Sequence, residues 1–163
     1  MSKPDELEIA KRRAMHLIAA REYGRNELTA KLRENYSEQT AEAVAELMCG
    51  YGYVDDRRYA EKLARAYIVT RGYGKSRAAL MMRQKGLEAD TIEEALGRYS
   101  EGDITDEIVS ILRKKYADRL FLPGVEGKKE MQKIIAALAR RGYGYDEIKT
   151  ALRVIESGSE EEE

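Results

Sequence analysis

Cysteine and histidine are almost absent from this chain of 163 residues, which holds one of each, Cys49 and His16. A single cysteine excludes an internal disulfide, and the two residues together are too few for a zinc site or a histidine cluster. We therefore expect both to be packing residues. No apolar run approaches the roughly 18 residues that span a bilayer. The first residues form no apolar secretory segment, so we expect a cytoplasmic protein with no membrane partner.

Catalytic motifs are missing as well. The chain has no glycine-rich phosphate loop, no dinucleotide-binding fingerprint and no Ser-His-Asp set around its one histidine. These absences predict a protein that is not an enzyme and binds no cofactor or metal. The adjacent carboxylates of Asp55 and Asp56 are the one pair that suggests metal binding or acid–base chemistry. Helix capping is the favoured interpretation, because acids at a helix start complement the helix dipole.

Charge is balanced overall but unevenly distributed along the chain. The sequence has 29 Lys plus Arg against 30 Asp plus Glu, yet residues 57–85 carry nine cations and Glu61 as their only acid. A solvated helix face usually alternates the two signs, so this stretch favours a surface for an anionic partner. The last residues are Ser157-Gly158-Ser159 followed by four glutamates, which predicts a disordered acidic tail over 157–163.

Apolar residues recur at spacings of three and four almost throughout, and the alternation typical of strands is nearly absent. Glycines and capping residues divide the helical stretches into three sets of three. We predict an all-α fold, a tandem array of three three-helix repeats that is elongated and slightly curved. The predicted repeats are residues 1–54, 55–102 and 103–156. The expected N-caps are Asn26, Ser37 and Asp55, and later helices are expected at 75–85, at 89–99 and from about Asp103.

Tyrosine takes the place of the other aromatic residues, with 11 Tyr against one Phe and no Trp. Several tyrosines lie in glycine-containing junctions between helices, at residues 22–24, 50–53, 72–74 and 142–145. Glycine after a helix adopts positive φ and closes the last turn, which is the structural interpretation of these junctions. Tyrosine beside arginine also suits an interface hot spot. Basic residues interleaved with tyrosine are equally typical of a groove for single-stranded nucleic acid.

Three motifs in order resemble one known family. They are Gly52-Tyr53-Val54-Asp55-Asp56-Arg57-Arg58-Tyr59-Ala60, then Arg71-Gly72-Tyr73-Gly74, then Gln84-Lys85-Gly86-Leu87. Together with Leu122-Pro123 and Arg141-Gly142-Tyr143, they closely resemble the RecX family of bacterial recombination regulators. The resemblance implies tandem three-helix repeats. It also implies a regulator that binds the RecA–DNA filament and inhibits RecA ATP hydrolysis, strand exchange and co-protease activity, and so modulates recombination and the SOS response.

Partner-binding residues are expected around the second repeat and the junctions that flank it. An interaction protein on the RecA filament and a sequence-independent module for single-stranded nucleic acid remain two open hypotheses, with single- and double-stranded DNA as further candidate partners. We expect a monomer. The candidate residues for contact with RecA or DNA are Arg57, Arg58, Arg71, Tyr73, Lys75, Arg77, Lys85, Arg140, Arg141 and Tyr143.

Overall fold

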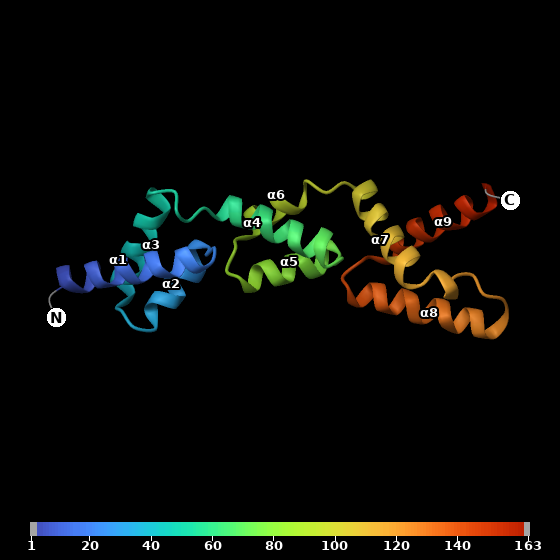
Figure 1. Cartoon of the computed structure of the whole chain (residues 1–163), viewed down its shortest axis with the longest axis horizontal. Coiled ribbons are helices and arrows are strands. Elements are labelled where there is room, and N and C mark those ends of the chain that lie inside the picture. The colour runs from blue at the N-terminus through green and yellow to red at the C-terminus, as the bar shows by residue number, and fades with distance from the viewer. Residues whose placement is uncertain (1–2, 162–163) are drawn as a thin grey trace. The chain divides into compact units, whose positions relative to one another are not determined.

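All regular structure in residues 3–161, the part of the chain that this computed structural model describes, is helical (Figure 1). The predicted all-α fold is therefore confirmed. A short π-helix, η1 (Ala66–Thr70), follows α4, and a 3-10 turn, η2 (Ala117–Arg119), follows α7. The α-helices are α1 (Lys3–Ala20), α2 (Arg25–Arg33), α3 (Glu38–Gly50), α4 (Asp56–Arg65), α5 (Lys75–Gln84), α6 (Ala89–Leu96), α7 (Glu101–Lys115), α8 (Gly124–Arg140) and α9 (Tyr145–Glu161).

The chain forms two compact units. The first unit comprises Met1–Leu63 and Met81–Ala95, and the second comprises Ala64–Leu80 and Leu96–Glu163. Residues of the expected second repeat, 55–102, thus belong partly to each unit. The division into three repeats stays a prediction. No helix of residues 3–161 is both long enough and apolar enough to cross a membrane.

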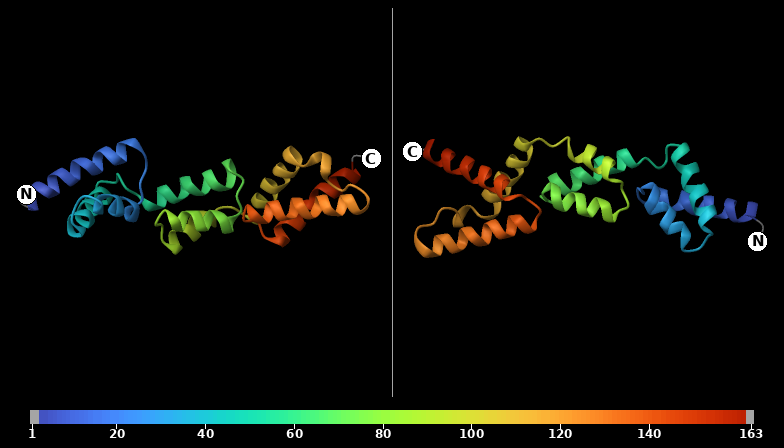
Figure 2. Two further views of the ribbon diagram at one scale, coloured as in Figure 1. Left: turned by 90° about the horizontal axis from the view of Figure 1, so that it is seen from below. Right: turned by 180° about the vertical axis from the view of Figure 1, so that it is seen from behind.

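The first unit has its core where α3 packs against α1 and α2, an arrangement that both views of Figure 2 show. Small side chains allow the helices to approach closely, and larger aliphatic ones fill the space between them. The fully buried residues include Ala10, Ala14, Leu28, Ala41, Val44, Ala45 and Met48. Ser37 caps α3 as predicted, because its hydroxyl accepts a hydrogen bond from the Thr40 N–H at 3.2 Å.

The N-terminus of α2 corrects one prediction. Gly24, and not Asn26, is the N-cap of this helix, and Asn26 instead donates from its side-chain amide to the Gly86 carbonyl. Two side chains complete this helix start: Glu27 Oε1 accepts from the Gly24 N–H at 3.3 Å, and Asp56 Oδ1, at the start of α4, accepts from the Arg25 N–H at 2.8 Å. Asp55 caps α4 itself through the Arg58 N–H at 3.1 Å. Both carboxylates of the pair therefore satisfy helix N-termini, Asp55 that of α4 as predicted and Asp56 that of α2, which was not predicted.

The second unit buries the apolar face of α7 against α9, and α8 packs against α9 (Figure 2). Helix α7 begins at Glu101, slightly before the predicted Asp103, because Ser100 and Asp103 form a reciprocal capping box. That cap requires extended backbone at Ser100, so α6 ends at Leu96 and not at residue 99. The side chains at the centre of this core are Ile104, Ile108, Leu112, Ile134, Leu138, Ile148 and Ala151.

The C-terminal segment also differs from the prediction. Helix α9 continues to Glu161, so the predicted disorder is wrong for the backbone of residues 157–161. Residues 162–163 lie outside the described part of the chain. Helix α9 extends this far because a helix already held by packing needs no new nucleation, and glutamate is a good helix former.

Candidate functional site

The structure separates the ten predicted partner-binding residues into two groups. Arg57, Arg58 and Lys85 belong to the first compact unit. The second unit holds the other seven, namely Arg71, Tyr73, Lys75, Arg77, Arg140, Arg141 and Tyr143. The cationic run of residues 57–85 therefore divides between two units, and each group is considered within its own unit.

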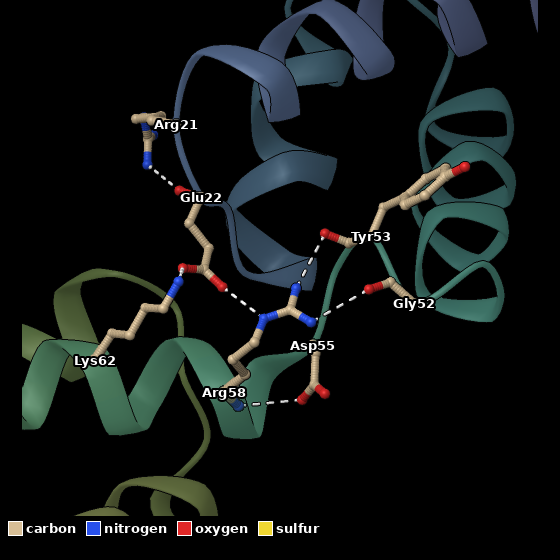
Figure 3. A network of polar contacts seen from close by, with 7 residues as sticks. All are labelled: Arg21, Glu22, Gly52, Tyr53, Asp55, Arg58 and Lys62. Atoms are coloured by element: carbon tan, nitrogen blue, oxygen red, sulfur yellow. Dashed lines mark hydrogen bonds and ion pairs between the residues drawn. The ribbon is translucent and has the colours of Figure 1, made fainter.

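Arg58 is at the centre of a polar network in the first unit (Figure 3). Its guanidinium donates to Glu22 Oε1 at 3.0 Å and to the carbonyls of Gly52 and Tyr53 at 3.4 Å. Lys62 Nζ approaches the other oxygen of Glu22 at 2.9 Å. These bonds connect α4 with the ends of α1 and α3, so the first role of Arg58 is structural.

Glu22 makes this network sensitive to pH. Burial alone would raise the pKa of Glu22, but hydrogen bonds from Lys62 and Arg58 outweigh it and hold the pKa below its ordinary value. The folded state therefore binds this proton less readily than the unfolded state. It follows that stability from the network is present above the ordinary glutamate pKa and is lost as pH falls through the lowered one.

We expect Glu22→Gln to reduce the free energy of unfolding near neutral pH by at most about 1 kcal/mol, since the two cations are partly exposed. The gap between variant and parent should narrow as pH falls below about 4.5, the ordinary value. Urea unfolding at a series of pH values measures it. A gap that is constant across the series would show that the charge of Glu22 contributes nothing.

The other two candidate partner-binding cations of this unit, Arg57 and Lys85, are also near carboxylates. Arg57 approaches Glu94 at 2.9 Å and Glu61 at 3.7 Å, and Lys85 approaches Glu27 at 4.0 Å. Two of these acids lie outside the 57–85 run, so the sequence count overstated the positive charge of the folded surface. The first unit therefore offers weaker support for an anionic partner than the sequence predicted.

In the second unit the junctions at residues 72–74 and 142–144 contact each other directly. The Gly74 N–H donates to the Arg141 carbonyl at 2.8 Å, and the Tyr143 hydroxyl donates to the Gly72 carbonyl at 2.9 Å. The Arg141 guanidinium adds a bond to the Arg71 carbonyl at 3.1 Å. Burial, followed by the charge of Glu107, raises the pKa of Tyr143, so its hydroxyl remains a donor. Tyr143 is thus a buried structural residue, which corrects its assignment as a contact residue.

Stacked tyrosines and arginines lie beside these junctions. The rings of Tyr67 and Tyr73 stack with centroids 6.2 Å apart. Arg77 lies over the Tyr73 ring at 4.1 Å, and Arg71 lies over the Tyr67 ring at 5.6 Å. The π-helix η1 carries Tyr67, and the Tyr67 carbonyl accepts from the Tyr73 N–H at 2.8 Å. Sequence reasoning missed Tyr67, although its spacing of six residues from Tyr73 places two tyrosines around one helix end.

Arg71 and Arg140 are exposed, although the Arg71 guanidinium also lies over the Tyr67 ring. The hydrogen bonds from neighbouring arginines at both positions end on the backbone carbonyls. The Arg71 carbonyl accepts from Arg141, and the Arg140 carbonyl accepts from Arg77 at 3.4 Å. Lys75, in contrast, donates from its ammonium to the Tyr99 carbonyl. We call Arg71, Tyr73, Arg77 and Arg140 the arginine–tyrosine surface, in which Arg71 and Arg140 are exposed and Tyr73 and Arg77 are half-buried.

The arginine–tyrosine surface is suited to binding a partner. Aromatic rings fix the orientation of the guanidinium groups above them, and a guanidinium group can stack on planar groups or pair with carboxylates and phosphates. Within residues 3–161, no group of three or more histidine, cysteine or carboxylate side chains is placed to hold a metal ion.

The fold and surface define an all-helical protein of short successive helices with exposed arginines beside helix junctions. Models of the RecX second and third three-helix domains match residues 55–96 and 103–152. A "Regulatory protein RecX" of Stenotrophomonas maltophilia (strain R551-3) is 32% identical over 142 residues, which cover 86% of this chain and 83% of the relative. One of Ectopseudomonas mendocina (strain ymp) is 35% identical over 144 residues, with 88% and 92% covered. The chain belongs to the RecX family, which confirms the resemblance.

A solved structure shows the same fold. The crystal structure of RecX from Lactobacillus salivarius matches with a TM-score of 0.84 and covers 94% of this chain and 98% of its own. Its sequence identity of 22% restricts the comparison to the fold.

Proposed function

We propose that the protein is a regulator that binds the RecA–DNA filament and inhibits RecA ATP hydrolysis, strand exchange and co-protease activity. Membership of the RecX family supports a regulatory role. In this proposal the chain acts as a cytoplasmic monomer, contributes no catalytic group, and modulates recombination and the SOS response through binding alone.

The observation that carries the proposal is the arginine–tyrosine surface. Arg71 and Arg140 are exposed, and the structural bonds at these positions are made by their carbonyls. Their side chains are thus available to a partner without loss of the junction. Arginine and tyrosine are also the residue types that most often dominate interface energies.

Binding of single-stranded nucleic acid is the second candidate, and the same stacking supports it. Arg77 over the half-buried Tyr73 ring presents a guanidinium plane on which a base can stack, whereas Tyr67 is itself buried. In that case the effect on recombination would be indirect, through competition for the DNA strand.

Titration at two salt concentrations separates the two candidates. The protein is titrated onto RecA filaments and onto the same single strand without RecA. We expect tighter binding to the filament and a shallow dependence of affinity on salt. Contacts that tyrosine and arginine make with a protein surface release fewer counterions than contacts with phosphates. Equal affinity for the bare strand, with a steep loss as salt rises, would instead identify a nucleic-acid-binding module.

A further inference from the structure

The loop between α7 and α8, together with the first turn of α8, exposes large apolar side chains that the arginine–tyrosine surface does not include. Phe121, Leu122 and Val125 are 43%, 42% and 70% exposed. Phe121 is the only phenylalanine of the chain, and Leu122-Pro123 is a motif that the structure leaves without a packing role in the core. We call Phe121, Leu122 and Val125 the apolar tip. Neighbouring exposed apolar residues of this size mark interaction sites more often than isolated ones do.

The backbone holds the apolar tip in a defined conformation. Phe121 has φ of 54°, in the left-handed region that a bulky residue rarely adopts and that costs of the order of 1 kcal/mol or more. The loop is also fixed from below by Gly127 of α8, where an added Cβ would overlap the carbonyl of Leu122. The loop is therefore pre-organised with its apolar side chains outward, which lowers the entropy lost on binding.

Charged residues around the apolar tip indicate the chemistry of its partner. Residues 114–133 carry six Lys or Arg and three acids, a positive excess. Within this stretch Arg119 and Lys133 pair with Glu130, and Lys129 pairs with Glu126. Asp118 and Glu126 are exposed and lie on either side of the tip in sequence. A phosphate backbone or an anionic lipid surface presents negative charge everywhere and would repel both carboxylates. A protein partner, in contrast, can offer an apolar pocket to the tip and place its own acidic side chains only opposite the Lys and Arg residues of this stretch.

We propose that the apolar tip is a second contact surface, which inserts into an apolar pocket with an acidic rim on a protein partner. The inference rests on the proposed function, since it takes a protomer of the RecA filament as that partner. Phe121 and Leu122 supply the apolar anchor, and Lys128, which is exposed on the first turns of α8, faces the acidic rim.

The test combines Phe121→Asn with Leu122→Ser in the full chain. Asparagine tolerates positive φ better than phenylalanine, so the double variant should keep or slightly gain stability while it loses the apolar anchor. We expect its dissociation constant for the RecA filament to rise about tenfold or more, the scale of a lost hot spot. Lys128→Glu should weaken binding less, and its effect should fade as salt rises.

Val154→Ser is the matched control, because Val154 is another apolar residue of the second unit and is 45% exposed. It should bind as the parent does. If the folded double variant binds the filament as tightly as the parent, the inference is wrong and the proposed function stands. If the double variant instead loses binding to bare DNA or to anionic vesicles, a protein partner is wrong. A parent protein that fails to bind the filament overturns both.

Discussion

Gly142→Ala should lower the free energy of unfolding by about 3 kcal/mol or more, because the added methyl group meets both backbone strain and a neighbouring helix. Gly142 has φ of 98°, a region that L side chains rarely adopt. A Cβ added there would lie 2.5 Å from the Cβ of Arg77 and 2.6 Å from its backbone nitrogen. Backbone strain and overpacking each cost about 1 to 3 kcal/mol, and the neighbour is a helix backbone that cannot move aside.

Gly102→Ala is the matched control, since Gly102 lies in α7 of the same unit with only Ser100 Oγ near its added Cβ, at 3.7 Å. Alanine should stabilise that helix by about 0.5 to 1 kcal/mol. Urea unfolding followed by circular dichroism measures both variants. Hydrogen exchange should show lost protection in the second unit for Gly142→Ala. Equal stability of Gly142→Ala and parent would mean that the two junctions do not pack as described.

Local patterns explain which helices could be predicted. Ser37 and Asp55 cap the helices that directly follow them, so the cap and its target lie within three residues of each other. The prediction of Asn26 as the N-cap of α2 was wrong, because the N-cap is Gly24 and the Arg25 N–H bonds to Asp56, 31 residues away in sequence. Periodicity relates only residues that are close in sequence, whereas the bond from Arg25 to Asp56 depends on the packing of α4 against the start of α2.

The candidate site shows the same limit. The sequence indicated that Arg71, Tyr73 and Tyr143 matter, but it did not indicate that Tyr143 is buried against the Gly72 carbonyl. The recurrence of Gly-Tyr-Gly could have indicated that the two junctions contact each other, because glycines on both sides of a tyrosine are typical of two backbone segments that approach closely. The charge count failed for another reason. Acids outside the run, such as Glu22 and Glu94, pair with its cations only in the folded chain.

On the proposed function, Arg71→Glu combined with Arg140→Glu should raise the concentration needed to inhibit RecA strand exchange by about a hundredfold, the largest functional loss expected here. Each reversal places a like charge opposite an anionic partner, and such contacts cost several kcal/mol in total. Stability should fall by no more than about 1 kcal/mol, the scale of the lost cation–π contact between Arg71 and the Tyr67 ring. Both residues are exposed, and the bonds from Arg141 and Arg77 end on their carbonyls, which the substitutions keep.

Lys149→Glu combined with Arg153→Glu is the matched control, because both cations are exposed on α9 and the change in net charge is the same. The control should inhibit as the parent does. Equal losses in the two double variants would show that net charge alone drives binding, and full inhibition by folded Arg71→Glu/Arg140→Glu would show that the arginine–tyrosine surface is misplaced. Arg71→Lys with Arg140→Lys then separates charge from geometry. Lysine keeps the charge but not the planar guanidinium, so inhibition should be restored only in part if stacking and bidentate pairing hold the partner.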